Sequence, residues 1–225
     1  EAIQKSCNVF FYQLMLKVGF DTWTEYGRRF GFGQTSNTDT GEETTGLLPS
    51  TEYYDSRYGK GKWTQGFLIR LAIGQGEVGV SPLQMVRYAA ALANGGTVYR
   101  PHAVELVRNK ETKKIEPIQR DSSLVGLSPH VMELIREGML RVVQSPGGTG
   151  ALARIPGILS AGKTGTAQNP HGKDHAWYVG FAPFDNPKIA VAVMLENSGF
   201  GGAKAAPLAG MIMEKYLYGE LIRNK

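Results

Sequence analysis

The apolar pattern of the N-terminal segment predicts two helices. Residues 8–19, N-V-F-F-Y-Q-L-M-L-K-V-G, are apolar on nearly every side and end in glycine, which is typical of a helix buried on most sides. Within it, Phe10, Phe11 and Leu14 form an apolar stripe that we expect in the core. Asp21 is expected to cap a second helix over residues 22–30.

Three more helices follow along the chain. A serine followed by proline, at Ser81 and again at Ser128, places a capping side chain before a residue that suits the first helical position. These pairs predict helices over residues 83–93 and 130–143. Helical spacing of apolar residues returns near the C-terminus, over 205–221.

Extended segments lie mainly in the second half of the chain. Residues 98–108 and 114–118 are predicted strands joined by a polar turn, which makes a hairpin. Residues 159–167, 176–182 and 188–196 are predicted strands with tight connections, which favour an antiparallel sheet.

One long segment shows no regular pattern. Residues 33–66 are rich in Gly, Thr, Ser and Asp, and we expect a long irregular loop there. The overall order predicts an α/β fold of the α+β type, an antiparallel sheet flanked by helices plus a helical subdomain. Residues 1–95 are expected to hold most of the helical subdomain and the long loop, and residues 96–225 the sheet with its C-terminal helix.

Composition narrows the classes of function. The chain has 225 residues, of which 42% are hydrophobic, and a net charge of +5. Its basic residues are dispersed apart from a cluster at 108–114, so nucleic-acid binding is not expected. The single cysteine, Cys7, excludes an internal disulfide and is expected to pack as a small apolar group. No apolar run has transmembrane length. Because the chain opens without methionine and its first residues look like the middle of a structural unit, we expect a piece of a longer protein.

Residues 157–166, G-I-L-S-A-G-K-T-G-T, match two incompatible active-site patterns. The first is the phosphate-binding loop G-x-x-x-x-G-K-[ST], which must run directly into a helix. The second is K-T-G, one of the elements of serine acyl-transferases, which needs an extended strand. Two glycines and a proline follow Lys163 closely, so a helix cannot start there. The K-T-G interpretation is therefore favoured.

Acyl transfer by a serine enzyme without a histidine base requires a hydroxyl, a cation or amine that manages its proton, and amide donors for the oxyanion. Ser6 and Asn8 supply a hydroxyl and a carboxamide at the start of a helix. Lys163 supplies the amine, and Thr164 and Thr166 are two residues apart on one strand, so their hydroxyls project from the same face. Taken alone, Ser6 and Asn8 would more often be helix caps.

These residues belong to a wider set of matches. The chain resembles the C-terminal part of the transpeptidase domain of a class B penicillin-binding protein, most closely the elongation-type (cell-shape) peptidoglycan D,D-transpeptidases. The matching blocks are S-C-N at 6–8, I-G-Q-G-E and S-P-L-Q-M within 73–85, A-L-A-N-G-G at 91–96, K-T-G-T-A at 163–167 and H-A-W-Y-V-G-F-A-P at 175–183. They occur in the family's order over nearly the whole chain.

The resemblance implies a role for each matching residue. Ser6 and Asn8 match the S-x-N motif, which helps relay protons and binds the substrate amide, and Lys163 assists that relay. Thr164 and Thr166 match the hydroxyls that bind the terminal carboxylate of a D-Ala-D-Ala stem peptide or a β-lactam, with Gly165 between them. The backbone N–H of Thr166 matches an oxyanion-hole donor.

Other residues are weaker candidates. Gly74, Gln75, Gly76, His175 and Trp177 are candidate cleft-lining residues. A metal site at His171, Asp174 and His175 is conceivable, but a hydrogen-bonded turn is the more ordinary interpretation of this loop. We expect no metal and no cofactor.

The family's nucleophile is the serine of an S-x-x-K motif that precedes S-x-N, and here S-x-N begins at residue 6. Ser56 has the wrong spacing to Lys60, and Ser6 has Val9 in the lysine position. By resemblance, the chain therefore lacks the acylated serine and is inactive alone, while the parent protein is the enzyme. Expected partners are the stem peptide, β-lactams, a membrane glycosyltransferase and other elongation proteins, at the extracytoplasmic face of the bacterial inner membrane.

Two alternatives remain open. A D,D-carboxypeptidase or serine β-lactamase of the same superfamily would pass the acyl group to water instead of an amine. A non-catalytic module could keep the fold only to bind stem peptide or a membrane partner. The presence of all five polar site residues argues against the second alternative.

Overall fold

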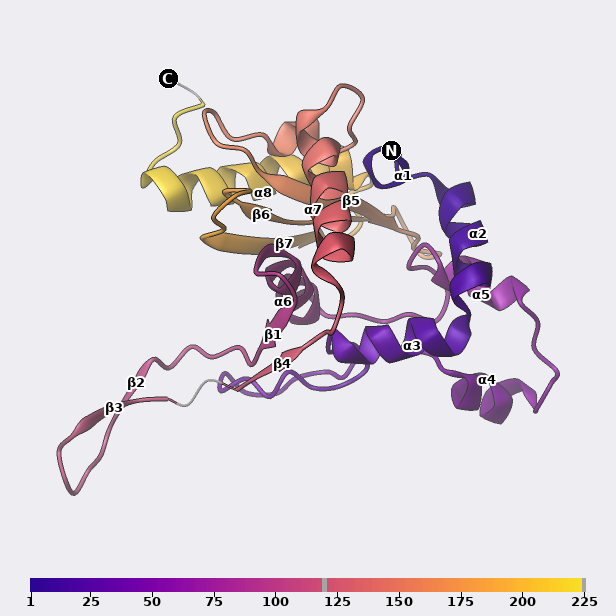
Figure 1. Cartoon of the computed structure of the whole chain (residues 1–225), viewed down its shortest axis with the longest axis horizontal. Coiled ribbons are helices and arrows are strands. Elements are labelled where there is room, and N and C mark those ends of the chain that lie inside the picture. Colours follow the sequence, from indigo (N-terminus) through magenta and orange to yellow (C-terminus); the bar gives the residue numbers. More distant parts are fainter. Residues whose placement is uncertain (119–120, 224–225) are drawn as a thin grey trace.

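An antiparallel sheet of three strands lies between two helical layers (Figure 1). The computed structural model describes residues 1–118 and 121–223. The sheet order is β5 (Ala161–Ala167), β6 (His175–Ala182) and β7 (Ile189–Leu195), so β5 is an edge strand. Helix α8 (Gly201–Tyr218) and the short turn η1 (Ala151–Ala153) cover one face. Helices α6 (Pro82–Ala93) and α7 (Pro129–Gln144) pack on the opposite side.

Alternation along the strands separates two apolar cores. Ala176 and Tyr178 of β6 pack in one cluster with Met213 of α8. Phe181 lies three residues after Tyr178, so its side chain points to the opposite face of the strand and packs in the other cluster with Ala91 of α6. The three predicted C-terminal strands and their antiparallel order are therefore confirmed.

The two serine–proline pairs begin helices as predicted. Ser81 Oγ accepts a hydrogen bond from the backbone N–H of Gln84, and the side-chain Oε1 of Gln84 accepts one from the N–H of Ser81. Ser128 caps α7 by accepting from the N–H of Val131. The remaining donors of Gln84 bind the carbonyls of Gln34 and Thr45, which fixes the long loop on α6.

Arg136 of α7 joins this helix to α6 and to the end of β6. Its guanidinium donates to the carbonyls of Leu92 at 3.1 Å, of Ala93, and of Phe184 at 2.7 Å. It also lies 5.1 Å from the ring centroids of Phe181 and Phe184. A single half-buried cation thus satisfies the carbonyl groups where three elements meet.

The N-terminal region is helical, as expected, but its burial differs from the prediction. The helices are α1 (Ala2–Lys5), α2 (Asn8–Val18), α3 (Phe20–Arg29), α4 (Thr51–Tyr58) and α5 (Gly66–Leu71). In α2 only Met15 is buried, whereas Phe10 is 47% exposed and Leu14 is 39% exposed. The expectation of a helix buried on most sides, with Phe10 and Leu14 in the core, was wrong. The apolar composition was recognised, but no neighbouring element in the described residues covers that face.

Two further local predictions need correction. Asp21 does not cap α3; it lies in the first turn and accepts a hydrogen bond from Thr51, while Gly19 holds the cap position. Residues 33–66 are not wholly irregular, because Ser50 accepts from Tyr53 and begins α4. That helix was missed because its polar composition gives little apolar periodicity.

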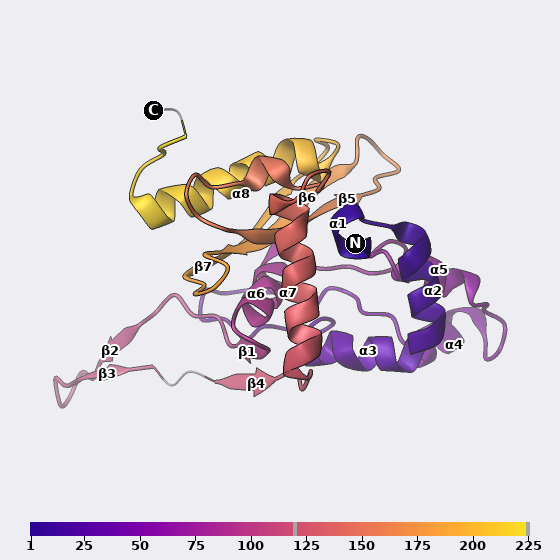
Figure 2. The same ribbon diagram turned by 45° about the horizontal axis from the view of Figure 1, so that its top comes forward.

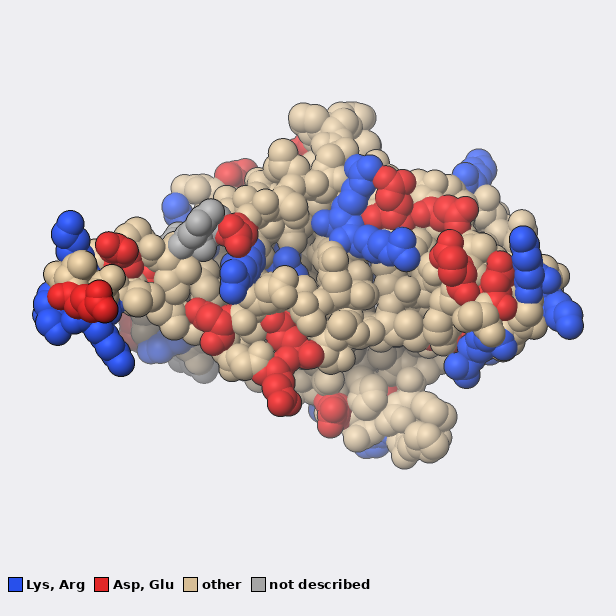
Figure 3. Space-filling model, turned by 90° about the horizontal axis from the view of Figure 1, so that it is seen from below, with Lys and Arg blue, Asp and Glu red and all other residues tan. Residues whose placement is uncertain are grey.

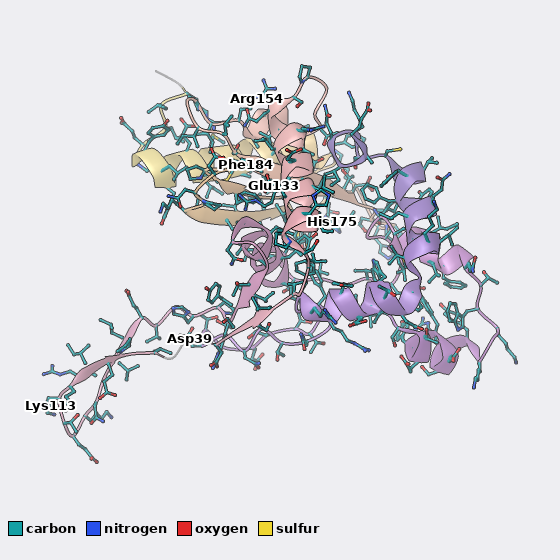
Figure 4. All side chains as sticks on the ribbon, in the orientation of Figure 1. Asp39, Lys113, Glu133, Arg154, His175 and Phe184 are labelled. Atoms are coloured by element: carbon teal, nitrogen blue, oxygen red, sulfur yellow. The ribbon has the colours of Figure 1, made fainter. Side chains whose placement is uncertain are left out.

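The predicted hairpin forms, but it is shorter than expected. β2 (Leu106–Arg108) pairs with β3 (Ile115–Pro117), and every residue of both strands is exposed. It extends away from the body with Lys113 near its tip (Figures 1 and 4). The start of the expected strand, β1 (Thr97–Tyr99), pairs instead with β4 (Ser122–Leu124). Pro101 separates β1 from β2, since proline removes a ladder donor.

Helix α8 begins at Gly201, one turn before the predicted start, and ends at Tyr218. A Cβ atom at Gly201 would lie 2.1 Å from the carbonyl oxygen of Gly165, so only glycine allows this close approach to the sheet. Within the described residues, no helix has the length and apolarity needed to cross a membrane. Lys, Arg, Asp and Glu are interspersed on the face shown in Figure 3.

Candidate active site

Helix α1 places Ser6 beside the sheet by docking on α7 (Figure 2). Ile3 packs against α7 at Gly138, where a Cβ atom would lie 2.7 Å from the Ile3 side chain. The side chain of Gln4 donates to the carbonyl of Pro146 at 3.1 Å. These contacts fix the turn between α1 and α2, which carries the S-C-N motif.

Ser6 occupies that turn in a left-handed conformation, with φ 53° and ψ 49°. This conformation is uncommon for a residue other than glycine. The N–H of Ser6 donates to the carbonyl of Ile3, and the N–H of Cys7 to that of Ala2, so the backbone polar groups are satisfied. Cys7 is the N-cap of α2, and no side chain caps this helix. Neither Ser6 nor Asn8 therefore caps α2 with its side chain, and Ser6 closes the C-terminal end of α1 through its backbone alone.

Lys163 connects the edge strand to Ser6. Its Nζ donates to Ser6 Oγ at 3.0 Å and to the carbonyl oxygen of Thr164 at 2.7 Å. Burial of the ammonium lowers the pKa of Lys163 to about 8. A lysine with such a pKa is partly neutral near pH 8, so its amine can exchange a proton with the Ser6 hydroxyl.

The same strand excludes the phosphate-loop interpretation. Lys163 lies in the middle of β5, paired with Val179 of β6, and no helix follows it. A phosphate loop needs a helix N-terminus at that position.

Thr164 and Thr166 project from one face of β5, as predicted. Thr164 Oγ1 lies 2.8 Å from Thr149 Oγ1, and Thr166 Oγ1 accepts a hydrogen bond from the N–H of Gly201 at 3.4 Å. The two hydroxyls thus lie near the start of α8, where the helix dipole favours negative charge. Gly165 lies between them opposite Trp177, where a Cβ atom would be 3.1 Å from Trp177 Cβ.

The candidate cleft-lining residues fall in two places. Gln75 reaches β5, where its side chain donates to the carbonyl of Thr166 at 2.9 Å and accepts from the N–H of Gln168 at 3.3 Å. Gly74 and Gly76 flank it in the turn after α5. His175, which is labelled in Figure 4, begins β6, and both His175 and Trp177 are half-buried in the first half of this strand.

Asn8 and Cys7 lie in the first turn of α2, both exposed. The exposure of Cys7 contradicts the expectation that it packs beneath the site. Among the described residues, the Asn8 carboxamide makes no hydrogen bond to another side chain, so it is available to a ligand.

The loop that joins β5 to β6 is a hydrogen-bonded turn. The backbone N–H of His171 donates to Asn169 Oδ1, Asp174 accepts from the Asn169 N–H, and His175 Nδ1 accepts from the N–H of Asn197. The described residues contain no group of three or more metal-ligand side chains.

A further S-x-x-K match within the chain escaped the sequence interpretation. Ser160 and Lys163 have this spacing. Ser160 is fully buried, its Oγ donates to the carbonyl of Ala153 at 3.4 Å, and an odd separation along extended chain directs the two side chains to opposite faces. Ser160 therefore cannot act as the nucleophile.

Comparison with known proteins places this geometry in a family. The family model described as penicillin binding protein transpeptidase domain matches residues 1–214. The chain is 36% identical over 236 residues to the peptidoglycan D,D-transpeptidase MrdA of Haemophilus influenzae, covering 96% of this chain and 36% of that protein. It therefore spans about a third of the length of that relative.

Solved structures of penicillin-binding proteins have the same fold as this chain. Pseudomonas aeruginosa PBP2 in complex with WCK 5153 has a TM-score of 0.84 at 37% identity, covering 99% of this chain and 50% of that one. PBP2 from Helicobacter pylori in complex with MreC has a TM-score of 0.79 at 28% identity, covering 97% and 39%. With the family model matching almost the entire chain and the S-C-N and K-T-G motifs joined in space, the chain belongs to the penicillin-binding protein transpeptidase domain family.

Proposed function

We propose that this chain is part of a D,D-transpeptidase that cross-links peptidoglycan and is acylated by penicillin. The observation that carries the proposal is the hydrogen bond from Lys163 Nζ to Ser6 Oγ at 3.0 Å. It joins two residues that are 157 positions apart in the sequence, and the Ser6 side chain is not used to cap α2. The relatives named D,D-transpeptidase support the same reaction.

The reaction begins with attack of a serine hydroxyl oxygen on the carbonyl carbon of the penultimate D-Ala. The proton leaves through the Ser6 and Lys163 pair and reaches the amine of the terminal D-Ala, which departs as the peptide bond breaks. An amine of a neighbouring stem peptide then attacks the acyl-enzyme, forms the cross-link and frees the serine.

The other residues bind and orient the substrate. The hydroxyls of Thr164 and Thr166 hold its terminal carboxylate beside the start of α8, and the Asn8 carboxamide binds the substrate amide. The backbone N–H of Thr166 stabilises the oxyanion, since a fixed amide donor is most effective where charge develops.

We propose that the acylated serine comes from the part of the parent protein that this chain does not span. Ser160 is buried on the wrong face of β5, and the chain corresponds to about a third of its relatives. The parent is proposed to act at the extracytoplasmic face of the bacterial inner membrane. Its proposed partners are β-lactams, a membrane glycosyltransferase and elongation proteins, with the PBP2–MreC complex as the supporting case.

Labelling with a fluorescent penicillin tests the proposal. The full-length protein should form a covalent adduct that survives denaturation, whereas the 225-residue chain should not. A stable adduct on the chain alone would contradict the external nucleophile. Incubation of the full-length protein with stem peptide and an amine acceptor should give the amide-linked product; release of D-Ala with only hydrolysed peptide would instead support a carboxypeptidase.

A further inference from the structure

Side chains bind both outward carbonyl groups of β5 in the site, those of Thr164 and Thr166. In an antiparallel strand, the N–H and C=O of one residue point to the same edge of the strand. The N–H and C=O of the next residue point to the opposite edge. Since Gln75 reaches the carbonyl of Thr166, that residue faces outward, away from β6, and so does Thr164. The Thr164 carbonyl is bound by Lys163 Nζ and the Thr166 carbonyl by Gln75. The outward N–H of Thr166 lies between these two capped carbonyls.

The Gln75 carboxamide has the hydrogen-bonding pattern of a peptide group. It donates to the carbonyl of Thr166 and accepts from the N–H of Gln168, two residues further along. One residue of a strand added to the edge of β5 would make the same pair of bonds. A peptide lying along this edge beyond Thr166 would therefore have to replace Gln75 as the hydrogen-bond partner of the Thr166 carbonyl and the Gln168 N–H.

We infer that Gln75 is a specificity-determining residue whose side chain an extended acyl donor must displace from β5. The inference rests on the proposed function. It specifies the class of ligand that Gln75 affects, namely acyl donors that extend beyond the Thr166 N–H. Ligands that end at the Thr166 N–H leave Gln75 in place. Ligands that carry a further amide beyond it compete with the Gln75 carboxamide for the same edge.

The surroundings of Gln75 permit this displacement. Its neighbours Gly74 and Gly76 both have positive φ, at 72° and 79°, a region that glycine enters without strain. A Cβ atom at Gly74 would meet nothing within 4 Å, whereas one at Gly76 would lie 3.3 Å from Arg70 Cβ, so the turn is open on the Gly74 side. Gln75 itself is only half-buried.

Acylation rates of the full-length protein test the inference with two matched ligands. 6-Aminopenicillanic acid ends at an amine, whereas benzylpenicillin carries an added amide and benzyl group. In Gln75→Ala the rate with benzylpenicillin should rise about 5-fold, the effect of removing roughly one competing hydrogen bond. The rate with 6-aminopenicillanic acid should change less than about 2-fold. Gln13→Ala, an exposed substitution on α2, should leave both rates unchanged.

The outcomes separate the inference from the proposed function. Equal losses for both ligands would make Gln75 a brace for β5 and overturn the inference while the function stands. Acylation by neither ligand in the wild type would defeat the proposed function itself. In that case NMR of the 225-residue chain decides on Gln75: adding diacetyl-Lys-D-Ala-D-Ala should shift its side-chain amide resonances, and unchanged resonances would overturn the inference.

Discussion

At the residue scale, the chemistry depends on Lys163 being held where its charge is costly. The amine is half-buried on β5, with the Ser6 hydroxyl and the Thr164 carbonyl as hydrogen-bond partners and no carboxylate among them. Burial without an anionic partner disfavours the charged form, which lowers the pKa. The same surroundings therefore orient the amine and prepare it for proton transfer.

The titration of Lys163 gives a direct prediction. Its amine should titrate with a pKa of about 8, far below the usual 10.5, when followed by NMR of the labelled side chain. Because the folded state binds this proton less tightly than the unfolded state, the free energy of unfolding should rise from pH 8 towards 10.5. Lys163→Met should lack that part of the rise. Titration together with the surface lysines would contradict the burial of the amine.

At the element scale, the sequence was sufficient to predict helices and strands whose determining contacts lie within a few residues along the chain. The capping serines Ser81 and Ser128 and the alternation of β5 depend on neighbours in sequence, so those elements could be predicted. The burial of α2 and the cap of α3 depend on partners distant in sequence, and they could not. Ser160 shows the same limit for motifs, since its full burial beneath the sheet depends on residues distant in sequence.

The role of Gln75 was also only partly accessible. The sequence indicated a glycine-flanked residue that lines the site, and in the structure its side chain is hydrogen-bonded to β5. Its bonds to Thr166 and Gln168 join segments 91 and 93 positions apart, and nothing in the local pattern specifies that pairing.

Arg136 tests how the helices are fixed to the sheet. Arg136→Met should lower the free energy of unfolding by roughly 3 kcal/mol, because it leaves the carbonyls of Leu92, Ala93 and Phe184 without their donor. Urea denaturation measures the loss. Arg141→Met is the matched control, since its ion pair with Glu137 is exposed and should cost less than about 1 kcal/mol. Equal effects would show that the Arg136 contacts are not structural.

The hairpin β2–β3 is an element that we expect to contribute little to stability. Replacing residues 105–117 with a short Gly-Ser linker should change Tm by less than about 4 °C, because the six strand residues are all exposed. Calorimetry of the two chains provides the comparison. Loss of cooperative unfolding would show that the hairpin belongs to the folding unit.

At the scale of the whole molecule, the N-terminal region presents an apolar surface beside the site. Val9 is 62% exposed, Phe10 47% and Leu16 48%, all on α2. Exposed apolar residues gathered on one helix favour association or binding of a partner. The chain should therefore bind a hydrophobic dye or self-associate.

Polar substitutions on α2 test whether its exposed apolar residues bind the dye. Phe10→Ser with Leu16→Gln should reduce dye fluorescence at unchanged stability, whereas Met15→Gln should destabilise the fold because Met15 is buried. Dye fluorescence and sedimentation of each variant provide the readout. A wild-type chain that is monomeric and does not bind the dye would argue against an exposed α2 surface.

The central claim is that Ser6 and Lys163 act as one proton-transfer unit, and a double-mutant cycle tests it most directly. The measurement is the rate of penicillin acylation of the full-length protein, for Ser6→Ala, Lys163→Ala and the combined variant, with Tm recorded for each. Each single substitution should lower the rate roughly 100-fold or more at nearly unchanged Tm, and the combined variant should be no slower than the slower single one. Losses that multiply in the combined variant, or rates close to wild type in either single variant, would contradict the account.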